Sequence, residues 1–467
     1  MTPTTKSIQS AEPAVAAAPR LQRVLGLWDL IVYGMVIIQV VAPIPIFGLV
    51  QQRSNGHAVT TILAAMVAMM LTAISYGRMA SLYPMAGSAY TYVARSINPH
   101  LGFMTGWAMF LDYLIIPLMS TIIPALAIQQ LIFHLPWVPR IPFTALAFVI
   151  ALLMTLLNLR GIRATARANL LLLIFSGFSV IAFMILAGRH AFLHSGWAGV
   201  FSVQPLYDPE TFRLGRILSG TSLAALTYIG FDGVTTLAED TINPRRNMVL
   251  ATVLVCFITG VLSAAELYLF QRVWPDWSTF PNLDTAYLDV MRLVGGALLF
   301  GVFSVVMSVS QFGAGFSGQA AAARLIYGMG RDNVLPRKIF GTLNPRTQNP
   351  ARNILLVGIF AFAGALVIPF EVACDLLNFG AFLGFMGVNL ATLWSHYIAP
   401  PQFYRRRFCR DAVLPIAGFV LCFLIWLGLP RLSKVVGGIW LSTGIIFCAA
   451  RTRGFRERPV LFDFRDS

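Results

Sequence analysis

Charged residues are scarce in this chain. Asp, Glu, Lys and Arg make up 11% of its 467 residues, whereas 57% are hydrophobic. A soluble globular domain carries about 25% charged residues. The deficit excludes an ordinary water-soluble protein and predicts that most of the surface faces membrane lipid.

Cysteine is also rare, and the five cysteines are not spaced as metal ligands or redox pairs. Most of them fall inside apolar runs, where Cys behaves as a small hydrophobic residue. We therefore predict neither a disulfide framework nor a metal site. The cysteines are Cys256, Cys374, Cys409, Cys422 and Cys448.

The signals of enzymes and nucleotide-binding proteins are missing as well. The chain has no H-E-x-x-H, no G-x-S-x-G and no P-loop. GAGFSG at 313–318 matches G-x-G-x-x-G, but it lies inside an apolar run rather than after a strand. We interpret it as a stripe of small residues for close helix packing. No enzyme activity and no cofactor are expected, and any pumping would be driven by an ion gradient.

Residues 1–20 lack the basic-then-apolar order and cleavage site of a secretory signal. We expect residues 1–24 to be a disordered cytoplasmic tail, and the first apolar run to remain as a membrane span.

What the chain has in abundance is long apolar runs. About twenty apolar residues in a helix cross a hydrocarbon core roughly 30 Å thick. The runs predict an all-α integral membrane protein of about twelve transmembrane helices. They are 27–50, 58–80, 102–130, 142–159, 168–187, 216–238, 248–270, 291–320, 353–369, 372–396, 412–429 and 433–450.

Basic residues concentrate in alternate loops. The net charge of +15 could suggest nucleic acid, but the Lys and Arg residues sit in short loops between apolar runs. With an even number of spans, 25 of the 34 fall on one side, including a basic tail at 451–467. Because cytoplasmic loops are enriched in Lys and Arg, we expect a multi-pass inner-membrane protein with both termini cytoplasmic and no nucleic-acid partner.

Two spans carry helix breakers near their middle. Pro43, Pro45 and Gly48 interrupt the first span, and Gly230 and Gly233 interrupt the sixth. Proline removes a backbone donor and clashes with the preceding turn. Unwound backbone at membrane depth is tolerated only where it lines a cavity or is buried in protein.

Paired breaks five spans apart indicate two inverted five-helix repeats with a binding site between the broken segments. The transporter core would then be 25–400, with two peripheral helices at 401–450. The alternative is a pair of ordinary kinked helices, since Gly and Pro are common in membrane spans.

Several stretches together resemble the amino acid/polyamine/organocation permeases, and the nearest subgroup is the bacterial putrescine importers. The resemblance covers about 25–400 and implies a leucine-transporter-type fold and secondary transport. The stretches are YPMAGSAYTYV at 83–93, SINPHLGF at 96–103, GFMTGWAMFLDYL at 102–114, YIGFDGVTTLAEDTINPRRN at 228–247, RLIYGMGRDNVLP at 324–336 and NPRTQNPARN at 344–353.

One position departs from the pattern that the resemblance implies. Putrescine importers carry an Asp in the first-span break, where this chain has Pro45. A diamine has two ammonium groups, and each favours a carboxylate partner in a low-dielectric site. An amino acid or a monoamine therefore stays open as the substrate beside putrescine.

The expected substrate site combines the two breaks with the third span. Asp232, in the sixth-span break, is the expected partner of an ammonium group and the expected residue for proton coupling or gating, although it could also cap a half-helix. Asp112 and Tyr113 lie in the third span, which lines the site by family resemblance, although Asp112 could equally pair with a neighbouring polar group. The predicted site residues are Ala42, Pro43, Ile44, Pro45, Asp112, Tyr113, Tyr228, Ile229, Gly230 and Asp232.

Other acidic residues receive structural interpretations. Glu266 is expected near interfacial water, and Glu371 and Asp375 are expected as solvated loop acids at the start of the tenth span. A proton is the expected coupling ion. Sodium, held by carbonyls of the first break with Ser310 and Ser317, remains an alternative, as does transport of an inorganic cation instead of an amine.

Overall fold

The computed structural model describes residues 24–83, 88–134, 137–161, 166–331, 335–345, 347, 349–400 and 405–457. Within these ranges the chain is helical, and its β structure is limited to an isolated bridge between Leu25 and Thr241. Most of the predicted N-terminal tail, 1–23, lies outside the described residues, and so does 458–467 of the C-terminal tail.

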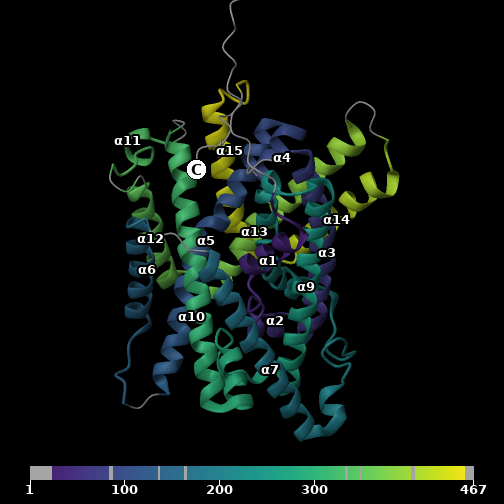
Figure 1. Ribbon diagram of the computed structural model, residues 1–467, viewed down its shortest axis with the longest axis vertical. Coiled ribbons are helices and arrows are strands. Elements are labelled where there is room, and N and C mark those ends of the chain that lie inside the picture. The colour runs from purple at the N-terminus through teal and green to yellow at the C-terminus, as the bar shows by residue number, and fades with distance from the viewer. Residues whose placement is uncertain are drawn as a thin grey trace, which may run out of the picture.

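The twelve predicted runs all correspond to helical spans (Figure 1). In the described part of the chain, nine helical segments are long and apolar enough to cross a membrane, and three shorter apolar helices, α1, α6 and α12, complete the set. The helices are α1 (Leu27–Ile38), α2 (Phe47–Arg53), α3 (Ala58–Leu82), α4 (Ser88–Ser96), α5 (Pro99–Phe133), α6 (Phe143–Leu159), α7 (Ala166–Val200), α8 (Leu214–Ala224), η1 (Ala225–Tyr228), η2 (Phe231–Asp240), α9 (Pro244–Val273), η3 (Trp277–Thr279), α10 (Ala286–Arg331), α11 (Arg337–Phe340), α12 (Ala351–Val367), α13 (Phe370–Leu393), η4 (Trp394–Ile398), η5 (Cys409–Val413), α14 (Leu414–Leu427) and α15 (Arg431–Arg451).

The first span is broken, as predicted. Helix α1 ends at Ile38, and residues 39–46 are turns before α2 begins. The chain enters the break at Gln39, whose φ is 67°, and the side-chain amide of Gln39 donates to the Ser310 carbonyl of α10 at 3.0 Å. Gly48 lies inside α2 rather than in the break, so its assignment as a breaker was wrong. A Cβ at Gly48 would lie 2.8 Å from the Ala286 Cβ, so glycine allows α2 to approach α10 closely.

The sixth span is broken at Ile229 and Gly230. Gly230 has a φ of 113°, which disfavours residues with a side chain. On one side of it lie α8 and the short helix η1, and on the other lies η2, a 3₁₀-helix that contains Gly233. A ten-residue 3₁₀-helix is unusually long, which marks this half-span as strained.

The two broken spans run in opposite directions and meet half against half. Helix α1 packs against η2, and α2 packs against α8. Because the first halves of the two spans lie toward opposite ends of the molecule, the breaks come together at its middle, as an inverted repeat requires.

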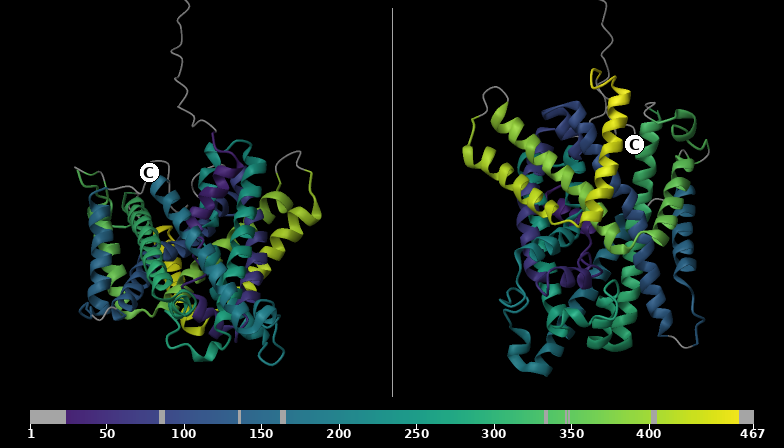
Figure 2. Two further views of the ribbon diagram at one scale, coloured as in Figure 1. Left: turned by 60° about the horizontal axis from the view of Figure 1, so that its bottom comes forward. Right: turned by 180° about the vertical axis from the view of Figure 1, so that it is seen from behind.

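Helices α5 and α13 form the centre of the bundle, and α7 and α15 form part of its margin (Figure 2). The most apolar windows of α5 and α13 are 72% and 78% buried, compared with 28% and 22% for α7 and α15. The exposed residues on the marginal helices are large and apolar, such as Phe178 and Ile446. Such a surface is stable only in contact with lipid.

The predicted small-residue stripe on α10 does pack closely. A Cβ at Gly315 would lie 2.7 Å from the Met154 sulfur of α6, and one at Gly318 would lie 2.7 Å from an Ile116 methyl of α5. GAGFSG is therefore a helix-packing motif in the part of α10 that follows the kink at Gly296, and no strand precedes it there as a dinucleotide site requires.

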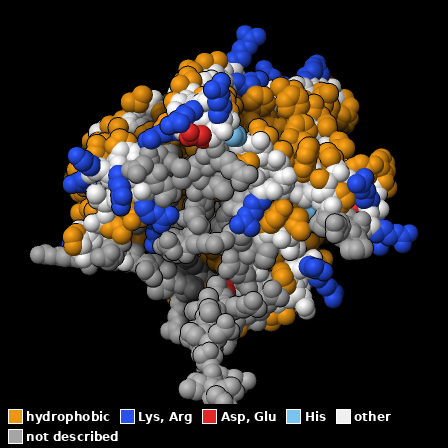
Figure 3. Space-filling view, turned by 90° about the horizontal axis from the view of Figure 1, so that it is seen from above, with side chains coloured by type: hydrophobic (Ala, Val, Ile, Leu, Met, Phe, Trp, Pro, Cys, Tyr) orange, Lys and Arg blue, Asp and Glu red, His pale blue; other side chains and the backbone are white. Residues whose placement is uncertain are grey.

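Loops that were predicted to share a side of the membrane contact one another. The Val24 amide donates to the Asp240 carbonyl, and His100 bonds the Glu457 carbonyl. Arg78 donates to the Arg410 carbonyl and pairs with Asp411. We call this end the basic face. Figure 3 looks onto it and shows Lys and Arg side chains spread around its margin with few acidic side chains in view.

Candidate functional site

Asp232 lies at the start of a helix in the middle of the bundle. It is the second residue of η2, two residues after the left-handed Gly230. Its own carbonyl accepts from Thr235 Oγ1 at 2.6 Å within the first turn. Free N–H groups at a helix N-terminus interact favourably with a carboxylate, and Asp232 is partly exposed there.

Asp112 approaches from α5 and lacks a complete set of partners. Its exposure is 6%, and its Oδ1 atom has no hydrogen-bond partner among the described residues. A Cβ on Gly380 of α13 would lie 2.7 Å from that oxygen, so the glycine leaves the space that the carboxylate occupies. A buried polar atom without a partner is a candidate for contact with a ligand.

The structure brings these two acidic residues together. Asp112 and Asp232 lie close enough for their charges to interact, although 119 residues separate them in the chain. Tyr113 of α5 and Tyr76 of α3 both lie near the two carboxyl groups. Of the predicted site residues in the third and sixth spans, Asp112, Tyr113 and Asp232 therefore lie near one another.

Aromatic rings form one wall of this place, and sequence reasoning missed them. The Tyr76 ring lies edge-on to Tyr92, Phe231 and Phe385, with centroid distances of 6.2, 5.2 and 5.9 Å. The Tyr76 hydroxyl is buried without a hydrogen-bond partner in the described part of the chain. The available signal was Tyr92, which lies within the 83–93 motif.

The other predicted site residues line the two breaks. Pro43, Ile44 and Pro45 are buried, whereas Ala42 is partly exposed. Tyr228 is also fully buried, and its hydroxyl donates to the Ile62 carbonyl of α3 at 2.9 Å, which fixes the end of η1.

Ile229 and Gly230 form the break itself, between η1 and η2. Residues in these two breaks expose backbone groups that no regular helix satisfies.

A family model described as amino acid permease matches residues 25–447. The chain belongs to this family. The low-affinity putrescine importer PlaP of Escherichia coli strain K12 is 32% identical over 94% of this chain and 96% of its own length. The branched-chain amino acid permease BcaP of Lactococcus lactis is 27% identical over 85% of this chain and 86% of its own. The methylthioribose transporter of Bacillus subtilis is 24% identical over 93% and 94%.

The family assignment confirms that this permease is a multi-pass membrane transporter for amino acids or polyamines, not an enzyme. It also confirms the all-α fold of about twelve helices. The match ends at 447, within α15, so it includes the last two spans.

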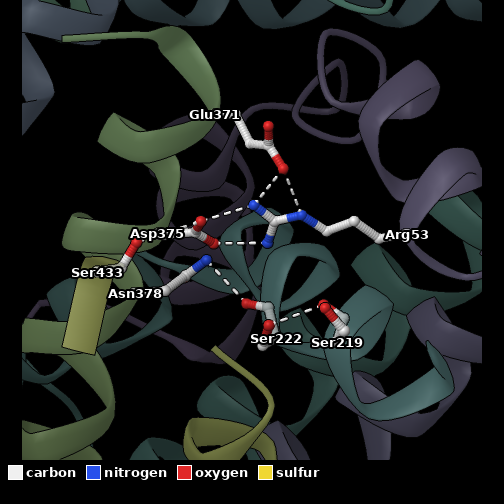
Figure 4. Close-up of polar contacts among 7 residues, drawn as sticks. All are labelled: Arg53, Ser219, Ser222, Glu371, Asp375, Asn378 and Ser433. Carbon is white, nitrogen blue, oxygen red and sulfur yellow. Dashed lines mark hydrogen bonds and ion pairs between the residues drawn. The ribbon is translucent and has the colours of Figure 1, made fainter. Parts of the chain in front are cut away.

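Helix α2 leads away from the basic face (Figure 1), and a buried ion pair lies at its end (Figure 4). Arg53 of α2 binds Asp375 of α13, and it also donates to Glu371 through Nε at 2.8 Å. The Asp375 side chain is 1% exposed, so the prediction of a solvated loop acid was wrong for it; Glu371, at 42%, remains half in water. The spacing of Glu371 and Asp375, one helical turn apart, could have indicated a shared cation.

The same end carries a further carboxyl. Burial, together with the nearby charge of Glu371, raises the pKa of Asp284 in the loop before α10. Three carboxyl groups therefore share this end with Arg53, which favours the approach of cations.

Proposed function

We propose that this permease imports a small amine, with a diamine such as putrescine as the first candidate, and that a proton gradient drives the uptake. The observation that carries the proposal is the approach of two carboxyl groups, Asp112 and Asp232, at membrane depth.

Two neighbouring carboxylates repel each other in a medium of low dielectric constant. A substrate with two ammonium groups removes that repulsion and gives each carboxylate a partner. Pro45 stands where putrescine importers carry an Asp, and we assign the missing carboxylate to Asp112 instead. The similarity to PlaP, which is named a putrescine importer, supports the same substrate class.

The remaining site residues have proposed roles that follow from their chemistry. Tyr113 and Tyr76 offer hydroxyl groups and ring faces to an ammonium, and a cation–π contact is worth about 0.5–2 kcal/mol. Backbone groups of 42–45 and 228–230 complete the pocket at the two breaks. Asp232 also serves as the gating residue, since it lies in the first turn of η2, next to the break at Ile229 and Gly230.

We place both termini in the cytoplasm and the protein in the inner membrane. The basic face is then the cytoplasmic face, because Lys and Arg are enriched in cytoplasmic loops. The Arg53–Asp375 pair lies at the outer end in this orientation.

The proposal is tested by uptake of labelled putrescine into proteoliposomes with an inward proton gradient. We expect uptake in the wild type, no uptake in Asp232→Asn, and normal uptake in the matched control Asp276→Asn, which changes an exposed loop acid. Asp232→Asn transporting like the wild type would refute the site.

A competition panel and ion currents separate the alternatives. If amino acids compete and putrescine does not enter, the substrate is an amino acid and Asp112 has another role. If a sodium gradient drives uptake and a proton gradient does not, the proposal that protons are the coupling ion is wrong. Steady ion currents that amines do not change would instead indicate that the transported substrate is an inorganic cation.

A further inference from the structure

Glu266 of α9 is a buried carboxyl group that the proposed substrate site does not use. Its exposure is 0%, and neither carboxyl oxygen has a hydrogen-bond partner among the described residues. The sequence-based expectation that it reaches interfacial water was therefore wrong. An ionised carboxylate without partners is strongly disfavoured in such surroundings.

The position of Glu266 along α9 is fixed by two contacts with the first span. Thr259 Oγ1 lies 3.6 Å from the Met35 sulfur of α1. The Phe270 ring lies 4.7 Å from the Phe47 ring of α2, measured between centroids. Glu266 lies between these contacts in the chain, so it is level with the break at 39–46.

Helical geometry also fixes the direction in which Glu266 points. At about 100° per residue, positions 259, 266 and 270 lie within roughly 40° of one another around the helix axis. Thr259 and Phe270 both face the first span, so Glu266 faces it as well. The carboxyl group is therefore directed at the unwound backbone between α1 and α2.

No charged side chain compensates Glu266. In the part of the chain that the structure describes, none on α1, α3, α7, α10, η1 or η2, which pack against α9, lies close enough to interact with it. Three titratable groups on α9 or close to the elements around it are engaged elsewhere: His57 accepts from the Asp208 amide, Tyr228 donates to a carbonyl of α3, and Arg272 donates to a carbonyl of α7.

We propose that Glu266 is a proton-binding site of the permease and carries the proton that crosses together with the substrate. This inference rests on the proposed proton-coupled uptake. A carboxylate that holds an ammonium group cannot hold a proton at the same time, so Asp112 and Asp232 are unsuited to carry a cotransported proton while the substrate is bound. Glu266 contacts neither of them and is free to do so.

The step is a simple proton transfer. Glu266 takes a proton from outer water when the first-span break is open to that side, and its neutral acid form is stable while the site is closed. When the break opens to the cytoplasm, water reaches the carboxyl group and accepts the proton. The empty permease then returns with Glu266 ionised, and the carboxylate takes its next proton from outer water only after the break has reopened to that side, so each cycle moves one proton inward. This return is the costly step, because the ionised form is disfavoured in the closed interior.

The test separates proton movement from substrate movement. Labelled putrescine exchange at equal pH on both sides needs no net proton flux, whereas putrescine-driven acidification of the vesicle interior, read by a trapped pH dye, does. We expect Glu266→Gln to exchange within about twofold of the wild type but to lose proton entry by roughly tenfold or more, because the amide cannot release a proton. Glu266→Asp restores proton entry, and Glu210→Gln, an exposed control, changes neither. Wild-type proton entry in Glu266→Gln would overturn the proposal.

An infrared measurement decides the proposal independently of transport. The wild type at neutral pH should show the carbonyl stretch of a protonated carboxylic acid that is absent from Glu266→Gln and shifted in Glu266→Asp. If the spectrum is the same in all three proteins, Glu266 holds no proton and the proposal fails. If the spectrum changes but the wild type transports neither putrescine nor amino acids, the proposed function fails instead.

Discussion

Arg53 holds Asp375 through two parallel hydrogen bonds, from Nη1 to Oδ1 at 2.7 Å and from Nη2 to Oδ2 at 2.6 Å. Such a bidentate pair has a fixed geometry as well as strong attraction. It joins α2, the half of the broken first span that leads away from the basic face, to α13 at the centre of the bundle. We therefore expect opening toward the outer side to require the separation of these two residues.

Arg53→Gln should destabilise the permease by about 3–5 kcal/mol, because it leaves the Asp375 carboxylate buried without its partner. Glu371→Gln is the matched control. That residue is half exposed, and its pair should contribute about 0–1 kcal/mol. Thermal unfolding of the purified variants measures both changes. Equal shifts in unfolding temperature for the two variants would show that the buried pair contributes no more to stability than the half-exposed one.

Asp112→Asn should distinguish diamines from monoamines. If Asp112 binds the second ammonium group, its loss costs putrescine binding about 2–5 kcal/mol, or roughly 30-fold or more in affinity. Binding of butylamine, which has a single ammonium group, should change little. Competition against labelled substrate measures both affinities. An equal loss of affinity for the two amines would show that Asp112 supports the structure of the site and does not recognise the second ammonium group.

Gly230→Ala should impair transport more than Gly233→Ala. Gly230 has a φ of 113°, where a side chain costs about 1–3 kcal/mol, and its added Cβ would lie 2.7 Å from an Ile37 methyl. At Gly233 the added Cβ would meet only the flexible end of Ile37, at 2.9 Å. Initial uptake rates at equal protein amounts give the comparison, and equal rates would indicate that the left-handed turn is not needed.

Trp440→Phe should lower stability while leaving transport intact. Trp107 and Trp440 each donate their indole N–H to the carbonyl of the other at 2.9 Å, and their rings stack at 5.0 Å between centroids. Loss of one such bond costs about 0.5–1.5 kcal/mol. Trp197→Phe, at an exposed position, should cost less. Loss of uptake in a folded Trp440→Phe protein would contradict the peripheral role proposed for 401–450.

The sequence by itself determined the number of spans, the approximate position of each and the location of both breaks. In lipid, every backbone group must be satisfied within its own helix, so a run of about twenty apolar residues has few alternatives to a spanning helix. Proline acts in the same local way, since Pro43 and Pro45 remove donors wherever the chain places them. Asp232 was identifiable because an acidic residue inside a span is costly and therefore rare.

Only the tertiary structure decided which residues meet. The approach of Asp112 to Asp232, the bidentate pair of Arg53 and Asp375, and the burial of Glu266 all depend on packing between helices distant in the chain. The packing role of Gly48 has the same origin, because a side chain there would collide with Ala286 of α10 and with the Leu283 carbonyl just before it. Lipid solvates every apolar helix surface about equally well, so the hydrophobic effect does not select which helices pack together. The shapes of the helix surfaces and their buried polar groups select the contacts, and the sequence pattern along one helix does not show these features.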